Sequence, residues 1–314
     1  MMLKHAFLIV AHGDWDQLQL LLQQIDYPNH DIFIHIDQKQ KKFPKTALEL
    51  STKFSKVHVF SNYKVFWGGY SLTMAEIYLF KKSREYGPYD YYHLLSGADL
   101  LLVNNQVFDL FFEKNQGMEF IEFKDEQNEH DPEIKRRTKL YHFLQNYRRR
   151  FRNQWLNNIF IFFERCSLLL QLILHVNRVK NLDWQIKLGS EWASVTNDFV
   201  IRMLQEEPKI SKLFRWTNCS DELLIQTIAF NCGFMDRVYH NPKGADNLRF
   251  IDWSRSKNGS PYIFTIADNK LLEDASSGAL IARKFSLAKD SEIINQVLRK
   301  TEKVKWRKDE SSTG

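Results

Sequence analysis

Cysteine is scarce in this sequence, and the few cysteines are not arranged to bind a metal. The 314 residues include Cys166, Cys219 and Cys232, with no CxxC spacing and no nearby histidine in a zinc-finger arrangement. This pattern argues against a structural metal. We expect free thiols because no secretory signal is visible, although a bridge between Cys219 and Cys232 stays open.

The sequence also lacks a long uninterrupted apolar run. The longest, Ile159 to Leu174, contains Glu164 and Arg165 and falls short of the roughly 18 to 20 apolar residues that a membrane span needs. The amino terminus shows neither an apolar signal region nor a small-residue cleavage site. We therefore expect a cytoplasmic protein, with any membrane contact peripheral and at the inner face of the plasma membrane.

Positive charge is concentrated in one segment of the chain, whose formal net charge is +6. Between Lys135 and Lys180 there are eleven lysines and arginines against one acid, Glu164. Such localised charge argues against a nucleic-acid-binding protein. Basic residues beside Trp155 and the apolar run 159–163 fit a helix that lies on an anionic membrane. The alternative is a pair of helices packed on the core with a solvated arginine face.

Apolar runs alternate with runs of helical periodicity through the first 95 residues, in a chain with 44% hydrophobic residues. The predicted elements are strands 5–10, 31–36, 57–60 and 91–95 and helices 15–25 and 72–84, the first helix with Asp14 as N-cap. This alternation predicts an α/β domain with a largely parallel sheet covered on both faces. Ligands of such sheets bind at the carboxyl ends of the strands.

Several polar or small residues follow the predicted strands and should meet at that edge. They are His12, Asp37, Trp67, Gly68, Gly69 and Asp99. The Asp37 carboxylate suits a nucleobase N–H or a ribose hydroxyl, or it caps the next turn. The two glycines let the backbone approach a ligand closely, or they form a simple turn.

Two carboxylates, Asp221 and Glu222, open a strongly helical run at 223–230, with Ser220 as the predicted N-cap. A carboxylate that faces a sugar donor can take the proton of an acceptor hydroxyl as its oxygen attacks the anomeric carbon. The alternative is that both acids only complement the helix dipole.

Fixed cations, and not a metal, are expected to neutralise a departing diphosphate. Arg249, Arg255, Arg283 and Lys284 lie in apolar surroundings and suit this role, unless they are simply solvated. The single Asp-x-Asp triplet, Asp14–Asp16, starts the first predicted helix, where it suits capping better than metal binding. We expect no essential metal.

Eight segments together resemble the core-2/I-branching β-1,6-N-acetylglucosaminyltransferase family, which includes the peptide O-xylosyltransferases. They are Phe7–His12, Ile34–Asp37, Val65–Ser71, Tyr91–Asp99, Gly189–Trp192, Asp221–Glu222, Leu248–Trp253 and Ala282–Phe285. The segment 131–182 is not covered by this resemblance.

The resemblance implies a GT-A type fold that binds a UDP-sugar without an essential metal and transfers the sugar with inversion. It implies that Glu222 is the catalytic base and that Lys284 faces the donor diphosphate. It also implies that Ala11, His12 and Asp37 contact the uridine. The other expected contacts of the nucleotide sugar are Trp67, Gly68 and Gly69. Arg255 is the expected second cation at the diphosphate, and Arg249 and Arg283 are the next candidates for that role. The acceptor residues are Asp99, Glu191, Trp192 and Trp253.

The predicted function is the transfer of N-acetylglucosamine, xylose or another sugar from a UDP-sugar to a glycan hydroxyl, with no further cofactor. Scarce cysteines and no visible anchor favour a bacterial-type enzyme of surface polysaccharide assembly that acts on a lipid-linked oligosaccharide. The alternative is a catalytically inactive sugar- or polyanion-binding module. We expect a nucleotide-sugar-binding half at 1–130, a basic aromatic helical insertion at 131–182, a catalytic and acceptor-binding half at 183–303, and a charged tail at 304–314.

Overall fold

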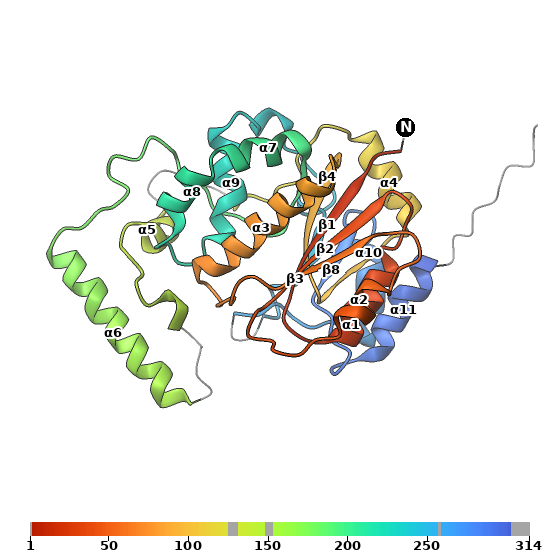
Figure 1. Ribbon diagram of the computed structural model, residues 1–314, viewed down its shortest axis with the longest axis horizontal. Helices are drawn as coiled ribbons and strands as arrows, with labels where there is room; N and C mark the ends of the chain where they lie inside the picture. Colours follow the sequence, from red (N-terminus) through yellow and green to blue (C-terminus); the bar gives the residue numbers. More distant parts are fainter. Residues whose placement is uncertain (1, 125–130, 148–152, 257–258, 303–314) are drawn as a thin grey trace, which may run out of the picture.

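A five-stranded sheet forms the centre of the computed structural model, which describes residues 2–124, 131–147, 153–256 and 259–302 (Figure 1). Its strands lie in the order β3 (Val57–Phe60), β2 (His30–Ile36), β1 (His5–Ala11), β4 (Tyr91–Ser96) and β6 (Ser194–Thr196). The pairs β3–β2, β2–β1 and β1–β4 are parallel, and only β6 runs antiparallel to its neighbour. The predicted α/β class and mostly parallel sheet are therefore confirmed.

Successive side chains of β1 enter two separate hydrophobic cores, one on each face of the sheet. Phe7 and Ile9 belong to one core and Ala6 and Leu8 to the other, because side chains alternate between the faces of a strand. The first core includes residues of α1 (Trp15–Gln24), α4 (Asn105–Lys114), α10 (Asn269–Ala275) and α11 (Ser291–Glu302). The second includes residues of α3 (Tyr70–Tyr86), α7 (Asn197–Gln205), α8 (Glu207–Phe214) and α9 (Asp221–Asn231). Helices thus cover both faces, as predicted (Figure 1).

Neither of the two predicted N-cap side chains caps its helix. Asp14 precedes α1 in the left-handed region, with φ 50°, and its side chain accepts no capping hydrogen bond. Ser220 precedes α9 with helical backbone angles, and its hydroxyl lies 2.7 Å from the Thr73 hydroxyl on α3. Ser220 therefore joins two helices, which corrects the expectation that it satisfies the first amides of α9.

A three-stranded sheet that was not predicted adjoins the carboxyl end of β4. It consists of β5 (Asp99–Leu101), β8 (Ile281–Arg283) and β7 (Arg249–Ile251), with β5–β8 antiparallel and β7–β8 parallel. Strands of three residues are too short to show an alternating pattern in a sequence. Their register places Asp99 opposite Arg283.

The expected helical insertion contains α5 (Pro132–Thr138), a 3-10 turn (Gln145–Tyr147) and α6 (Gln154–Ile173), and α6 lies apart from the sheet (Figure 1). By length and composition alone, α6 is long and apolar enough to cross a membrane. This corrects the sequence expectation, since Glu164 and Arg165 do not interrupt the helix. The arginines at 148–152 and the predicted tail at 304–314 lie outside the described residues. The remaining helical segments are α2 (Lys45–Glu49), Met235–Arg237 and Ile266–Asp268.

Candidate active site

The Asp37 carboxylate lies at the carboxyl edge of the sheet, where it holds two loops together. Its Oδ1 accepts hydrogen bonds from the amides of Lys39, at 2.9 Å, and Val65, at 3.2 Å, and its Oδ2 lies 3.1 Å from Lys39 Nζ. The Asp37 amide donates to the Ala11 carbonyl at 3.0 Å, which links the ends of β2 and β1. These contacts are those of the turn-capping alternative. The uridine contacts of Asp37, Ala11 and the exposed His12 stay predictions.

The turn at Trp67, Gly68 and Gly69 packs against the start of α9. Gly68 has a φ of +69°, and its carbonyl accepts a hydrogen bond from the Cys219 amide at 2.9 Å. A Cβ at Gly68 would lie 3.1 Å from Cys219 Sγ, and a Cβ at Gly69 would lie 2.5 Å from Asn146 Oδ1. The glycines therefore permit close approach of other parts of the chain. This packing brings the turn next to the predicted catalytic helix, with the Trp67 side chain 49% exposed.

The Glu222 carboxylate, in the first turn of α9, forms an ion pair with Arg137 of α5. Arg137 Nη1 lies 2.5 Å from Glu222 Oε2, and Arg137 Nη2 lies 2.5 Å from Glu133 Oε1. The Arg137 side chain is buried, whereas the Glu222 side chain is 37% exposed and so reachable by a ligand. The sequence places Arg137 among the clustered cations that we expected to form a basic surface. The structure corrects this, because Arg137 holds the predicted base.

The pKa of Glu222 is raised above its ordinary value. Burial is the largest cause and the negative charge of Asp221 the next, while Arg137 acts in the opposite direction. A general base works only in its ionised form, so its activity should be lost as the pH falls through this raised pKa. Arg137 thus favours the form of Glu222 that catalysis needs.

Two further acids, the buried Glu76 and the partly buried Glu191, lie beside Asp221. Asp221 and Glu191 share a hydrogen bond, and burial together with the charge of Asp221 raises the pKa of Glu191 well above its ordinary value. Burial also raises the pKa of Asp221. Burial likewise raises the pKa of Glu76. Burial therefore disfavours a negative charge on each of these three acids.

Arg283, at the end of β8, connects these acids to the predicted acceptor residues. Its guanidinium lies 2.8 Å from Asp99 Oδ1, contacts the Ser96 hydroxyl, and stacks 4.3 Å from the centre of the Trp192 ring. The positive charge of Arg283 also acts on Glu191. Three of the four predicted acceptor residues are therefore in one cluster. Trp253 is the exception, since it is 55% exposed and, among the described residues, no side-chain hydrogen bond or ion pair joins it to this cluster.

Lys284 follows Arg283 and is half-buried. Burial and the neighbouring Arg283 charge lower the pKa of Lys284, while the negative charges of Asp14 and Asp99 oppose this shift. Its Nζ donates to the Ser260 hydroxyl at 3.3 Å. Asp14 precedes α1, so Lys284 lies near the loop that follows β1. The contact of Lys284 with a donor diphosphate stays a prediction.

The other two predicted cations are engaged elsewhere. Arg255 is bound by Asp252, at 2.6 Å, and Asp268, at 2.7 Å, and these carboxylates offset its charge. Arg249 is buried, donates to the Ala193 carbonyl at 2.8 Å, and has its pKa lowered by burial to about 9. Arg249 therefore fixes the sheet and is removed from the candidate diphosphate cations. The contact of Arg255 with the diphosphate stays a prediction. To make it, the Arg255 guanidinium would have to leave one of these carboxylates and bind a phosphate instead.

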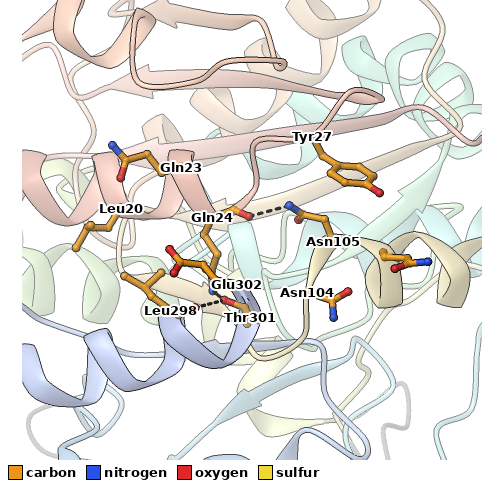
Figure 2. A pocket seen from close by; sticks show the side chains of 10 residues that line it. Leu20, Gln23, Gln24, Tyr27, Asn104, Asn105, Leu298, Thr301 and Glu302 are labelled. Carbon is orange, nitrogen blue, oxygen red and sulfur yellow. Dashed lines mark hydrogen bonds between the residues drawn. The ribbon is translucent and has the colours of Figure 1, made fainter. Parts of the chain in front are cut away.

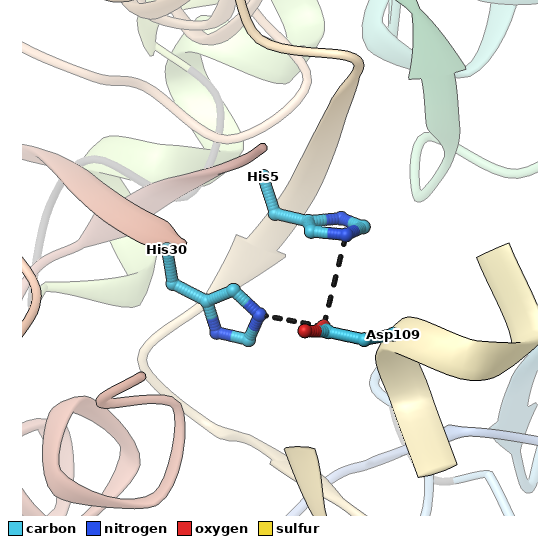
Figure 3. A group of neighbouring side chains, drawn as sticks. All are labelled: His5, His30 and Asp109. Carbon is cyan, nitrogen blue, oxygen red and sulfur yellow. Dashed lines mark hydrogen bonds and ion pairs between the residues drawn. The ribbon is translucent and has the colours of Figure 1, made fainter. Parts of the chain in front are cut away.

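A group of side chains that could hold a metal, His5, His30 and Asp109, is buried at the opposite edge of the sheet (Figure 3). His5 and His30 begin β1 and β2, whereas Asp37 follows the end of β2. Asp109 Oδ1 lies 2.8 Å from His30 Nε2 and 3.7 Å from His5 Nε2. His5 Nδ1 lies 2.9 Å from His93 Nε2, so the group is part of a buried hydrogen-bond network. The group of His5, His30 and Asp109 is therefore not part of the candidate site at the carboxyl edge of the sheet.

A surface pocket of about 280 Å³ also lies away from the predicted site, beside α1 and α11 (Figure 2). Its lining includes Gln24, Tyr27, Asn105, Leu298 and Thr301. None of the residues that line it was predicted to bind donor or acceptor. The candidate site is therefore defined by the polar cluster at the carboxyl edge.

The family model of the core-2/I-branching enzymes matches residues 5–273. The chain belongs to the core-2/I-branching enzyme family. The matched range includes the ends of β1, β2 and β4, Arg137 and both carboxylates of α9, whereas Arg283 and Lys284 lie beyond it. The family resemblance stated from the sequence is confirmed, and the mostly parallel α/β sheet agrees with the fold class that it implied. The GT-A type of that fold stays a prediction.

Curated relatives of the core-2/I-branching chain are xylosyltransferases. Xylosyltransferase 1 of Homo sapiens is 23% identical over an alignment of 317 positions that covers 93% of this chain and 30% of that protein. Xylosyltransferase sqv-6 of Caenorhabditis briggsae is 24% identical over an alignment of 263 positions that covers 81% of this chain and 29% of that protein. The chain thus spans about 30% of the length of these relatives.

A solved structure, that of mouse xyloside xylosyltransferase 1 in its apo form, aligns with 89% of this chain and 96% of its own. The TM-score is 0.36 and the sequence identity 9%. This likeness is too remote to carry an argument about the fold or the site.

Replacing Arg137 by glutamine should move the acid limb of the kcat/KM profile to higher pH. The cation lowers the pKa of Glu222, so its loss lets burial and Asp221 raise that pKa further. The measurement is the pH dependence of sugar transfer by Arg137→Gln, Arg137→Lys and wild type. Arg136→Gln, whose side chain is 74% exposed, is the control. Lysine should restore part of the shift, and an unmoved limb in a folded Arg137→Gln protein would contradict the assigned pairing.

Proposed function

We propose that the chain is an inverting glycosyltransferase that moves a sugar from a UDP-sugar to a hydroxyl of a glycan, without an essential metal. The observation that carries this proposal is the placement of Glu222. Its partly exposed carboxylate lies beside the Asp221–Glu191 pair, and Arg283 links that pair to Asp99, next to Lys284. Base, acceptor contacts and cations therefore come from three distant parts of the sequence to one edge of the sheet.

Inverting transfer needs a base on the face of the sugar opposite the leaving group. Glu222 takes the proton of the acceptor hydroxyl while that oxygen forms its bond to the anomeric carbon. The bond from the anomeric carbon to the diphosphate oxygen breaks in the same step, and UDP leaves with the electron pair. Arg137, fixed by Glu133 and Glu222, orients the base and keeps it ionised.

Lys284 supplies positive charge to the departing diphosphate in this proposal. A half-buried ammonium interacts more strongly with phosphate than a solvated one, because water screens it less. We propose Arg255 as the second cation at the diphosphate, as the resemblance implies, and Arg283 as the next candidate for this role. Asp37 and the Ala11–His12 backbone hold the uridine in the same proposal.

Transfer should therefore be unaffected by a chelator. The Asp-x-Asp triplet Asp14–Asp16 lies at the start of α1, where the charge of Asp14 acts on Lys284. We expect initial rates with and without EDTA to agree within about twofold, because fixed cations take the role of a metal. Loss of turnover in EDTA that manganese restores would contradict the metal-free site.

The sugar and its acceptor are tested by one experiment. The relatives are named xylosyltransferases, which supports UDP-xylose, and the family name supports UDP-N-acetylglucosamine, so both belong in a panel of UDP-sugars. We propose an acceptor that is a lipid-linked oligosaccharide of surface polysaccharide assembly, at the inner face of the plasma membrane. Donor hydrolysis identifies the sugar, and the anomeric configuration of the transferred sugar, followed by NMR, tests inversion. Retention of configuration would contradict the proposal.

A further inference from the structure

The buried residues of helix α6 are all polar, whereas many of its large apolar residues are exposed. Asn157, Glu164 and Gln171 are its buried residues, and they recur every seven positions along one face. Glu164 lies 3.3 Å from His142 Nδ1. Gln171 accepts from the Tyr141 amide at 2.8 Å and donates to its carbonyl at 3.0 Å. A polar stripe therefore fixes α6 to the protein.

The opposite face of α6 presents large apolar side chains to the surroundings. A helix turns by 100° per residue, so positions 155, 162, 166, 169 and 173 lie about 180° from the buried stripe. Nine of the 22 exposed large apolar side chains of the described residues lie between 155 and 174. They are Trp155, Ile161, Phe162, Phe163, Leu169, Leu170, Leu172, Ile173 and Leu174. This concentration is greater than a surface in contact with water alone would carry.

The charge of this region identifies what covers the apolar face. The sequence from Lys135 to Lys180 holds eleven lysines and arginines, and its single acid, Glu164, is buried against the protein. The described cations Lys135, Arg136 and Arg165 are exposed. Apolar side chains beside exposed cations match acyl chains beside anionic headgroups.

We propose that α6 lies in the plane of an anionic phospholipid bilayer, with its apolar face among the acyl chains. The length of α6 suffices to cross a membrane, but the bonds of Glu164 and Gln171 hold the helix against the chain at Tyr141 and His142. Crossing would break these bonds and place polar side chains in hydrocarbon. This contact is independent of the transfer chemistry, and it anchors the enzyme at the surface where a lipid-linked acceptor would lie.

Vesicle flotation of the whole chain tests the proposal. Wild type should float with vesicles of phosphatidylglycerol and phosphatidylcholine, and less with phosphatidylcholine alone. The variant Phe162→Gln/Phe163→Gln/Leu169→Gln/Leu170→Gln should bind the anionic vesicles at least about tenfold more weakly. A matched control, Leu50→Gln/Phe54→Gln/Val107→Gln/Leu110→Gln, removes four exposed apolar side chains elsewhere and should bind like wild type. Wild-type binding by the α6 variant, or no binding by wild type, would overturn the proposal.

Cys166 gives a second readout, because it is exposed at the centre of the apolar face while Cys219 is buried. Its alkylation by a water-soluble maleimide should be at least about fivefold slower on anionic vesicles, where lipid covers it. A Leu110→Cys protein should keep its label rate at position 110. Equal alkylation of Cys166 in vesicle-bound protein would show that another surface makes the contact.

Two further measurements separate the rival arrangements. Alkaline carbonate should release the bound protein, since an in-plane helix is extracted and a spanning helix is not.

Light scattering should find the lipid-free chain without a dimer that depends on α6. A dimer abolished by the four glutamines, together with absent vesicle binding, would assign the apolar face to a second copy and refute the membrane contact.

Discussion

Replacement of Glu222 by glutamine should lower sugar transfer by about 100-fold or more. Glutamine keeps the size of the side chain but cannot take a proton from the acceptor hydroxyl. The loss should fall on kcat, since the change removes an interaction made in the transition state. Steady-state transfer by Glu222→Gln and wild type, with the donor identified from the UDP-sugar panel, is the measurement.

The control for this experiment is Glu85→Gln, which removes an exposed carboxylate at the end of α3 and should leave transfer unchanged. Asp221→Asn separates the two adjacent carboxylates of α9. Asp221 is buried and hydrogen-bonded to Glu191, so its change should alter the pH dependence of the reaction more than the chemistry of proton transfer. Comparable turnover in wild type and Glu222→Gln would leave the alternative of an inactive sugar-binding module.

Replacement of Lys284 by methionine should weaken UDP binding by about tenfold or more and lower kcat as well. Methionine fills the same space but leaves the diphosphate without its half-buried cation. Negative charge on the leaving group grows in the transition state, so kcat/KM should fall further than the affinity for UDP does. Isothermal titration with UDP and steady-state kinetics of Lys284→Met measure the two effects.

Lys289→Met is the matched control, because Lys289 is exposed and five residues further along the chain. It should bind UDP like wild type. A lysine-to-arginine change at 284 retains the charge and should recover part of the affinity. Unchanged UDP binding by Lys284→Met would remove Lys284 from the donor site and leave Arg255 or Arg283 as the diphosphate cation.

The central strands could be predicted because their side chains are apolar for a physical reason. Strands β1, β2 and β4 are buried on both faces, so they appear as continuous apolar runs bounded by polar loops. The strands β5, β7 and β8 have three residues each, and their pairing joins positions up to 184 residues apart, such as Asp99 and Arg283. No local pattern encodes such a contact.

The site could be predicted in part for the same reason. Residues that directly follow parallel strands share an edge, so the meeting of Asp37 with the end of β1 follows from topology. Arg137 was missed because its sequence neighbours, Lys135 and Arg136, are exposed cations that hide a buried one. The sequence did contain a sign of this ion pair. Glu133 and Arg137 are four residues apart, a spacing at which opposite charges pair on one face of a helix.

The helix α6 shows a different limit of sequence reasoning. Glu164 was taken as an interruption of an apolar run, although one polar residue per seven is a stripe and leaves a helix intact. Which stripe faces the protein depends on partners such as His142, more than 20 residues earlier in the sequence. Only tertiary structure shows that the polar stripe is the inner one.

The claim that Glu222 acts on chemistry within a metal-free nucleotide site is tested most directly by titrating UDP into the Glu222→Gln protein in EDTA, beside its transfer rate. We predict an affinity within about twofold of wild type together with the loss of transfer, because the base contacts the acceptor and not the nucleotide. Full transfer by this variant, or UDP binding that appears only when a divalent metal is added, would contradict the account.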